Sequence, residues 1–576
     1  MFKNILFDFD NTLYDYDYAN KKAIETVFFK ISENFNLNNL NNVYEEEKNK
    51  FKNYCYNASS HNKFIQLKKI FEKFNLDLNK LNYYYDLYID IFKNNSKLYP
   101  NLLDFLDFCT KNGIKMYILT NNTCKEQIER LQKLELLKYF TKVYTSEEFG
   151  IEKPDIKLFY YVIQDINCNK NEIVKIGDNY KNDIEPLILN NIYSFWFNDN
   201  FSINNSYLEF DSYNNLLNLF KKYYTNLNDF LYISNYIGER FDLVQAGGGN
   251  TSFKIDDSMF IKSSGCNLSN MDVNKNYVGL NYYNILKKIK NINCSDKKNR
   301  ELKSKEIVES NIIFFKNNKP SIETTLHCLT KKYTVHIHPI QFNYISSLDN
   351  CNNILKKIFK NYCIIDYFTP GIDVTLELLK KYNNESVIFM KNHGLVVTAD
   401  TIYEIKELLH NITNKLENEL KLDYSEHHLV NHFSENLQAI TNQKCVTYLS
   451  NNNFISDFIK NKCEKDINKY FNSFFPDKIV YCGIHYIYFK IEENLKNKIE
   501  KYIETYLEFP KIFILERNGK KYLYISSNSL TKCKEIEEVL ISHLICYNDN
   551  NIFLDKNEIE YLNNWDAEKF RKNLNN

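Results

Sequence analysis

Two carboxylates near the start of the chain have a spacing that suits acid–base chemistry. Asp8 and Asp10 close the apolar run "NILFDFD", which is typical of a buried parallel strand. Side chains two positions apart on a strand point the same way. One carboxylate could therefore act as a nucleophile while the other donates or accepts a proton. A D-x-D pair alone also fits a helix cap or a solvated turn, so other motifs must decide.

Later segments offer groups that bind phosphate. The apolar segment "IKMYILTNNT" ends in Thr120 and Asn121, whose hydroxyl, amide and backbone N–H groups are neutral donors for a phosphate oxygen. Lys153, in "GIEKPD", precedes a helical stretch and could offset the charge of a nucleophile and a phosphoryl group together. The alternatives are a capping role for Thr120 and a surface charge for Lys153.

A further predicted strand is followed by two more carboxylates. The segment "EIVKIGDNYKNDI" places Asp178 and Asp183 on the loop after an apolar run. Together with Asp8 they suit Mg²⁺, which takes oxygen ligands and keeps several waters. A turn would equally explain Asp178 taken alone. All these motifs follow in order at strand ends, where α/β sheets bind ligands, and this predicts one site for phosphoryl transfer.

In this order the motifs resemble those of the haloacid dehalogenase-like hydrolases, over about residues 1–220. The matching positions are Asp8, Asp10, Thr12, Thr120, Lys153, Asp178 and Asp183. The resemblance implies that the first aspartate forms an aspartyl-phosphate, that the second acts as acid and then as base, and that the threonine and lysine of the later motifs hold the phosphate. It also implies Mg²⁺ on the four aspartates, and a Rossmann-like α/β core with a helical cap at about residues 15–95.

Two histidines in the second half have the spacing of metal ligands. In "YTVHIHP" the strand pattern puts His336 and His338 on the same side. A third imidazole could come from His393 in "VIFMKNHGLVV", and Glu323, in the helix before the strand, is the obvious carboxylate. Such a set fits zinc, which binds imidazole nitrogen and carboxylate oxygen. The alternatives are a core histidine at position 393 and a satisfied histidine pair on the strand.

A glycine-rich segment before these histidines could hold a phosphate. The stretch "LVQAGGGNTSFKIDDSMFIKSSG" combines glycines, which allow close backbone approach, with uncharged donors such as Asn250, Ser264 and Gly265. A glycine-rich turn between two strands would explain the same residues. His428 and His432 are one helical turn apart and form a weaker candidate metal pair.

In order along the second half stand "GGGNTS", "KSSG", "PSIET", "HIH" and "KNHGL". This series resembles the class II aldolase/adducin family, and most of all its sugar-phosphate aldolases, over about residues 230–420 and weakly beyond. The resemblance implies a class II aldolase-like α/β/α domain. It also implies Zn²⁺ on His336, His338 and His393, with Glu323 as fourth ligand and as the base that transfers the proton.

The same resemblance implies a phosphate pocket. The matching positions are Asn250, Ser264, Gly265 and Ser321. Lys254 and Lys262 could add positive charge to it. Ile322 departs from the pattern, because the short aldolases have a second serine at this position beside Ser321. Phosphate could therefore be held differently, or the substrate could differ.

Length and composition favour a multidomain protein of a reducing compartment. We expect three regions in the 576 residues, namely 1–224, 225–440 and an extension of the second half at 441–576. Lys+Arg and Asp+Glu are both 73, so the net charge is zero. This does not indicate a basic surface for nucleic acid or an acidic membrane. Fourteen cysteines without a C-x-x-C pair, no signal peptide and no apolar run of membrane length favour a cytoplasmic protein.

Both halves therefore point to small phosphorylated sugars. We expect a bifunctional enzyme whose first half removes phosphate and whose second half cleaves or forms a C–C bond in a ketose phosphate. The aldolase resemblance implies a homo-oligomer, usually a tetramer. Alternatives for the second half are a dehydratase or a 4-epimerase of the same family. A non-enzymatic, adducin-like binding module predicts loss of the metal ligands, yet all four are present.

Overall fold

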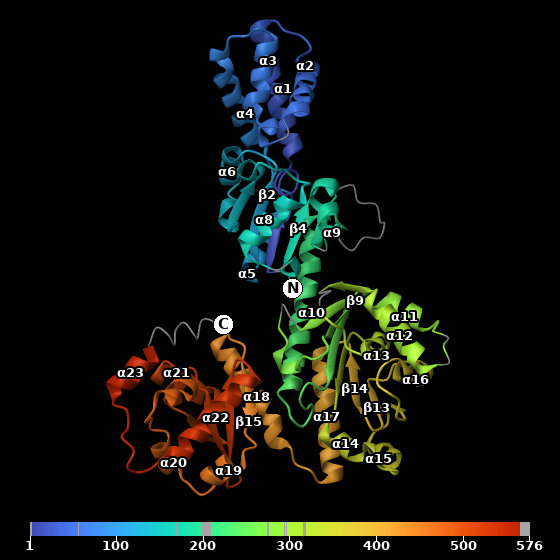
Figure 1. Cartoon of the computed structure of the whole chain (residues 1–576), viewed down its shortest axis with the longest axis vertical. Coiled ribbons are helices and arrows are strands. Elements are labelled where there is room, and N and C mark those ends of the chain that lie inside the picture. The colour runs from blue at the N-terminus through green and yellow to red at the C-terminus, as the bar shows by residue number, and fades with distance from the viewer. Residues whose placement is uncertain are drawn as a thin grey trace. The chain divides into compact units, whose positions relative to one another are not determined.

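The fold is described from a computed structural model of the 576-residue chain (Figure 1). It describes residues 3–55, 57–168, 170–190, 192–198, 209–272, 276–292, 294, 296–314 and 318–564. Within these residues no helix is both long and apolar enough to cross a membrane. The chain divides into two compact units, Met1–Thr225 and Asn226–Asn576. The division falls inside one long helix, α10 (Tyr213–Gly238).

The core of the first unit is a six-stranded parallel sheet. Its strands are β1 (Asn4–Phe7), β2 (Lys115–Thr120), β3 (Lys142–Thr145), β4 (Ile173–Gly177), β5 (Tyr193–Phe197) and β6 (Glu209–Phe210). In space they follow the order β3-β2-β1-β4-β5-β6, and every pair is parallel. The strand order reverses between β1 and β4, and the carboxyl ends of strands at such a point frame a ligand crevice.

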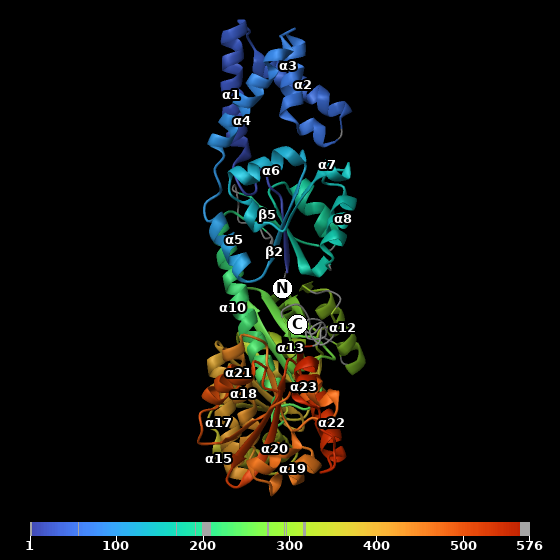
Figure 2. The same cartoon turned by 90° about the vertical axis from the view of Figure 1, so that its left-hand side faces the viewer.

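Helices cover both faces of this sheet, which is why its central strands β1 and β2 are mostly apolar. Helix α8 (Ile156–Ile166) packs on the face that carries Leu6. Helix α5 (Leu102–Lys111) packs on the other face, where the rings of Phe105 and Phe7 have centroids 6.3 Å apart. Figure 2 shows α5 and α8 on opposite sides of the sheet. Neighbouring residues of β1 thus anchor the two layers.

Four helices between β1 and β2 form a separate bundle, here called the cap. They are α1 (Tyr16–Phe35), α2 (Leu40–Tyr54), α3 (Lys63–Lys73) and α4 (Leu81–Asn95). Figure 1 shows them gathered into one group. Helix α3 begins where the side chain of Asn62 accepts from the N–H of Ile65. The aromatic rings of Phe71 and Tyr84 then meet at 5.6 Å and join α3 to α4.

The second unit begins with an eight-stranded mixed sheet. Its strands are β7 (Asn250–Ile255), β8 (Ser258–Lys262), β9 (Tyr277–Asn281), β10 (Ile312–Phe314), β11 (Tyr333–Ile337), β12 (Cys363–Ile365), β13 (Val387–Met390) and β14 (Gly394–Ala399). The order is β10-β9-β8-β7-β11-β14-β13-β12, and only β12 and β13 pair in parallel among these strands.

Two helical layers enclose this sheet. One face is covered by α11 (Tyr282–Ile289), α12 (Lys297–Glu309), α13 (Thr324–Leu329) and α16 (Ile372–Lys381). On the other face α10 packs Phe230 against Phe253, with ring centroids 5.2 Å apart. Helix α17 (Ile402–Leu420) runs beside β14. The predicted α/β class with a second layered domain is thereby confirmed.

The last part of the described chain forms a four-stranded sheet in the order β15-β18-β17-β16. These strands are β15 (Val446–Leu449), β16 (Ile487–Lys490), β17 (Ile512–Arg517) and β18 (Lys520–Ser527). Helices α18 (Ser425–Thr441) and α21 (Leu495–Tyr506) cover one face, and α22 (Leu530–Cys546) lies on the other. The end of the expected extension, residues 565–576, lies outside the described residues.

Two candidate active sites

The first candidate site lies at the carboxyl ends of the central strands of the six-stranded sheet. Asp8 follows β1, Thr120 ends β2 and Asp178 follows β4. Lys153 comes from the segment before α8, and Asp183 from the helical turn after β4. The fold thus brings together side chains from four segments that are far apart in the sequence.

Lys153 forms ion pairs with two carboxylates of this site. Its Nζ lies 2.6 Å from Asp8 Oδ1 and 2.7 Å from Asp183 Oδ1. A second lysine, Lys175, reaches Asp183 Oδ1 at 2.9 Å from within β4. All four side chains are buried. Sequence reasoning missed Lys175, although a lone cation inside the apolar run "EIVKIG" was a signal, since a charge in a buried strand needs a partner.

Burial and the neighbouring charges shift the pKa values of the acids in this cluster. One oxygen from each of Asp8, Asp178 and Asp183 lies within 4.8 Å of the others. Burial, followed by the two neighbouring charges, raises the pKa of Asp178 to about 8. Burial and the charge of Asp183 also raise the pKa of Asp8. Burial acts on Asp183 too, but the two lysines hold its pKa below the ordinary value.

The acidic cluster fits a magnesium ion. Its carboxylates offer the oxygen ligands that Mg²⁺ takes, and a divalent cation would relieve their repulsion. Thr12 fixes the orientation of Asp178: its hydroxyl donates to Asp178 Oδ1 at 3.0 Å and accepts from the Asp178 N–H at 3.1 Å. Asp183 Oδ1 accepts from both lysines, whereas its buried Oδ2 has no hydrogen-bond partner among the described residues.

Hydrogen bonds orient Asp10 and Thr120. The Tyr14 hydroxyl donates to Asp10 Oδ1 at 2.6 Å. Gln127, fully buried on α6 (Cys124–Lys133), donates from Nε2 to Asp10 Oδ2 at 3.0 Å and to Thr120 Oγ1 at 2.9 Å. Because the Thr120 oxygen accepts from Gln127, its own proton can be donated to a ligand. Sequence reasoning missed Gln127, which belongs to no strand-end motif.

Asn121 differs from its expected role as a phosphate ligand. Its Nδ2 donates to the backbone carbonyl of Lys153, and its Oδ1 accepts from the Lys153 N–H, each at 2.9 Å. The amide therefore fixes the segment that carries the lysine and is not held open for phosphate. The sequence could not reveal this, because positions 121 and 153 meet only in the folded chain.

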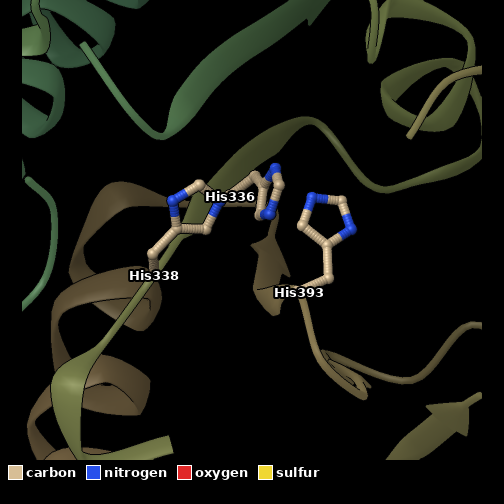
Figure 3. Close-up of side chains that lie close together, drawn as sticks. All are labelled: His336, His338 and His393. Carbon is tan, nitrogen blue, oxygen red and sulfur yellow. The ribbon is translucent and has the colours of Figure 1, made fainter. Parts of the chain in front are cut away.

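The second candidate site gathers three histidines from the eight-stranded sheet. His336 lies in β11, His338 follows it, and His393 lies in the turn between β13 and β14. One nitrogen of each ring lies within 4.8 Å of the others. The ring of His336 has its centroid 4.9 Å from each of the other two, and Figure 3 shows it between them. The expected convergence of the three imidazoles is therefore present.

Glu323 borders these imidazoles. Its Oε2 lies 2.6 Å from His336 Nδ1, and its Oε1 lies 3.3 Å from His393 Nε2. It directly precedes α13 at the N-cap position, whereas we expected it inside a helix. Burial would raise its pKa, but pairing with the two histidines holds the pKa of Glu323 well below its ordinary range. Burial and then the charge of His336 lower the pKa of His338 to about 4.

This donor set fits a zinc ion. The atoms His336 Nε2, His338 Nε2 and His393 Nδ1 are buried and have no hydrogen-bond partner among the described residues. Imidazole nitrogens and a carboxylate are the ligands of many catalytic zinc sites. Gly394 leaves room for the rings, because a Cβ there would lie 2.7 Å from His338 Cδ2 and 2.9 Å from His336 Nε2.

The expected phosphate residues lie at the start of β7 and in two adjoining loops. Asn250 begins β7 beside β11, and its buried Oδ1 lacks a hydrogen-bond partner within the described ranges. Ser264 and Gly265 follow β8, and the N–H of Ser264 donates to the carbonyl of Lys319 at 2.9 Å. Ser321 stands two residues further along that second loop. The glycine-rich run precedes β7 and is not the turn between β7 and β8.

Lys254 and Lys262 are engaged by backbone carbonyls. Lys254 Nζ donates to the carbonyl of Thr330, and Lys262 Nζ donates to that of Cys266 at 2.7 Å. Burial lowers the pKa of Lys254 to about 8. We expected these two ammonium groups to contribute to a phosphate pocket. Their hydrogen bonds to backbone carbonyls do not support that role.

The weaker histidine pair of α18 does not converge on one point. His428 Nε2 lies 3.1 Å from Glu417 Oε1 and 3.7 Å from Asp242 Oδ2. His432 instead contacts Asn436 on its own helix. The two rings take different partners, and the ligand atoms of His428, Glu417 and Asp242 instead lie within 4.8 Å of one another.

Two family models match separate regions of the chain. Residues 5–186 match the model described as haloacid dehalogenase-like hydrolase. Residues 229–420 match the model of the class II aldolase and adducin N-terminal domain. The first range contains the acidic cluster around Lys153, and the second contains the three histidines.

Curated relatives resemble parts of the chain. The uncharacterized oxidoreductase YuxG of Bacillus subtilis is 30% identical over 195 residues, which are 31% of this chain and 27% of the relative. A glyceraldehyde 3-phosphate phosphatase of Methanocaldococcus jannaschii is 27% identical over 197 residues, 32% of this chain and 80% of the relative. A ribulose-1,5-bisphosphate 5-phosphatase of Halopiger xanaduensis is 28% identical over 189 residues, 31% of this chain and 78% of the relative.

The chain thus spans about a quarter of the length of the Bacillus protein and about four fifths of the two phosphatases. The two family matches do not overlap, and each coincides with one candidate site. The chain therefore joins a domain of the haloacid dehalogenase-like hydrolase family to a domain of the class II aldolase and adducin family.

Proposed function

We propose that the first unit is a Mg²⁺-dependent phosphatase for small phosphorylated sugars. The observation that carries this proposal is the Lys153 ammonium held between Asp8 and Asp183, with Asp178 beside them. Phosphoryl transfer mainly needs positioning and neutralisation of charge, and this cluster supplies both at one sheet edge. The similarity to two phosphatases of small sugar phosphates supports the substrate class.

In this proposal each side chain has a distinct task. Asp8 attacks phosphorus and forms an aspartyl-phosphate, while Lys153 offsets the charge of both groups. Asp10 gives a proton to the leaving oxygen and then takes one from the attacking water. Thr120 donates its hydroxyl proton to a phosphate oxygen. Covalent catalysis of this kind divides one difficult step into two easier ones.

The acidic cluster would hold the metal on one side of the phosphoryl group. Asp8, Asp178 and the backbone carbonyl of Asp10 would be its ligands, and when bound Mg²⁺ neutralises charge on the phosphoryl oxygens. Asp183 would also orient Lys153, since its Oδ1 accepts from that lysine and from Lys175, while its Oδ2 has no partner among the described residues. In the proposal Asp183 thus positions Lys153 and keeps an oxygen for the metal contact expected from the sequence.

We further propose that the second unit is a zinc-dependent aldolase that cleaves or forms a ketose phosphate. This rests on Glu323 paired with His336 and His393, with His338 completing the donor set. When bound, zinc acts as a Lewis acid toward a carbonyl oxygen. Glu323 would then move the proton, and Asn250 with the loop after β8 would hold the phosphate.

The two activities can be separated by a ³¹P NMR time course on the full chain with Mg²⁺ and Zn²⁺. Substrates are glyceraldehyde 3-phosphate, a panel of ketose 1-phosphates, and dihydroxyacetone phosphate with aldehydes. We expect Asp8→Asn to slow the release of inorganic phosphate about 10³-fold or more, because the nucleophile is lost. His336→Ala should abolish the turnover of dihydroxyacetone phosphate and leave phosphatase activity intact.

Phosphate release that survives Asp8→Asn would exclude the phosphatase proposal. If phosphate is released but no C–C chemistry follows on any substrate, the aldolase proposal fails. Formation of a dehydrated or epimerised sugar phosphate that needs His336 would instead assign the second unit to another reaction of its family.

Binding of Mg²⁺ should depend on pH through Asp178. Its pKa of about 8 means that below this pH the metal must displace a proton, so affinity should rise by up to about tenfold per pH unit between pH 6 and 8 and then level off. Calorimetric titration of the full chain measures this. Asp178→Asn should lose both the affinity and the pH dependence, whereas Asp165→Asn on the exposed side of α8 should keep them. A flat profile in the unaltered protein would contradict the assignment.

Gln127 should act as a positioning residue for Asp10 and Thr120. Gln127→Met preserves the size of the side chain and removes its hydrogen bonds to Asp10 and Thr120, together with the one its Oε1 accepts from Arg130 at 3.3 Å. We therefore expect kcat for phosphate release to fall about tenfold or more with little change in KM. Gln132→Met, exposed on the same helix, is the matched control and should behave like the unaltered enzyme. Equal kcat values for the two variants would refute this role.

A further inference from the structure

A pocket in the second unit is formed by residues that belong to neither candidate site. It lies between α10, α18 and the segment that follows β8, and its volume is about 520 Å³. This size falls within the range of sites that bind small molecules. Its walls combine apolar side chains such as Leu231 and Met271 with amide and carboxylate groups.

Three oxygens of the lining residues lack hydrogen-bond partners in the described part of the chain. They are Asn235 Oδ1, Glu239 Oε2 and Asn431 Oδ1. Glu239 is 8% exposed and Asn431 is 4% exposed. Asn431 Nδ2 donates to the Tyr236 carbonyl at 2.8 Å, which fixes the direction of its Oδ1. Buried acceptors without partners are rare in native proteins, so three in one pocket require an explanation.

The other charged groups at this pocket are already engaged. Lys444 Nζ donates to two backbone carbonyls of the segment after β8, at 2.8 and 3.3 Å. Glu435 accepts from Lys406 Nζ at 3.0 Å and from the Tyr232 hydroxyl. Once Glu239 is ionised, its carboxylate and the two amide oxygens can therefore act as acceptors for a ligand that brings donors.

We propose that this pocket binds a small organic molecule through a primary ammonium group, which donates to Asn235, Glu239 and Asn431. An ammonium has three N–H donors and one positive charge, so it can satisfy all three oxygens and pair with the carboxylate. A hydroxyl would supply one donor and no charge. A bare metal ion matches less well, because one carboxylate and two amides would leave most of the pocket unfilled.

Glu239 couples this binding to a proton. Burial raises the pKa of Glu239 to about 8, although hydrogen bonds from Ser434, Asn431 and the backbone act in the opposite direction. The other titratable groups around it are Asp272, Glu435, Lys444, Cys445 and Cys533, with Tyr232 and Tyr236 in the pocket wall. A bound ammonium favours the carboxylate form. Binding at pH 7 should therefore release about one proton, and apparent affinity should rise from pH 6.5 to 8.5.

Calorimetric titration of the full chain with ethanolamine and 1,4-diaminobutane tests this proposal, with ethylene glycol and 1,4-butanediol as uncharged probes of similar size. Titrations at pH 7 in two buffers of different ionisation enthalpy report the proton released. We expect the amines alone to bind. Glu239→Gln should weaken them about tenfold or more and abolish proton release, because a hydrogen-bonded charge pair is lost. Glu435→Gln, a carboxylate that already has partners, should change affinity less than about threefold.

Asn431→Ala is a second variant and should also weaken the amines, and equal melting temperatures would verify that the variants fold. The proposal is overturned if the diols bind as tightly as the amines, or if Glu239→Gln leaves amine affinity unchanged. It is also overturned if Mg²⁺ or K⁺ displaces the amines from this pocket. Absence of binding by either amine at about 10 mM, where millimolar affinity is detectable, would overturn it as well.

Discussion

Both candidate sites depend on one constraint, namely that charges buried at strand ends must be compensated. In the first unit three acids converge on a region from which water is largely excluded, and Lys153 holds two of them at 2.6 and 2.7 Å. Lys175 adds a second cation behind Asp183. Asp178 is left without a lysine partner, and its pKa rises to about 8. The uncompensated acid marks the position where a divalent cation would act.

The second unit meets the same constraint with one carboxylate among several imidazoles, whereas the first unit has several carboxylates. Here one carboxylate, Glu323, is surrounded by imidazoles, and its pairing with His336 and His393 keeps it charged. Nitrogen donors and a single carboxylate suit zinc, whereas the oxygen donors of the first unit suit magnesium. One chain thus holds two donor sets that suit different metals, and in the proposed function both sites act on phosphorylated sugars. Under that proposal, a shared class of substrate would account for the occurrence of both sites in one polypeptide.

The residues that sequence reasoning identified are those that follow strands. Asp8, Thr120 and Asp178 stand at strand ends because a parallel sheet gathers such positions at one edge, and His336 and His338 share a side because a strand has a period of two. The Rossmann-like core and the aldolase-like sheet were expected from the resemblance of the ordered motifs to two families. Periodicity carries no information on which side chains meet across the fold.

The residues that sequence reasoning missed or misassigned serve other residues of the site. Lys175 compensates Asp183 from inside a strand, and Gln127 bridges two catalytic candidates from a helix. Asn121 looked like a phosphate ligand but holds the backbone of Lys153. Gln127 and Asp10 are 117 positions apart and Asn121 and Lys153 are 32 apart. Lys175 and Asp183 are close in sequence but lie in different elements, so only the tertiary structure reveals these contacts.

Metal analysis of the full chain tests the central claim most directly. The protein is dialysed with Mg²⁺ and Zn²⁺ and its bound metal is measured by mass spectrometry for the unaltered chain, Asp178→Asn and His336→Ala. Two independent sites predict one tightly held zinc per chain in the unaltered protein and in Asp178→Asn, and loss of zinc in His336→Ala alone. Zinc that persists in His336→Ala, or that is lost in Asp178→Asn, would contradict the account.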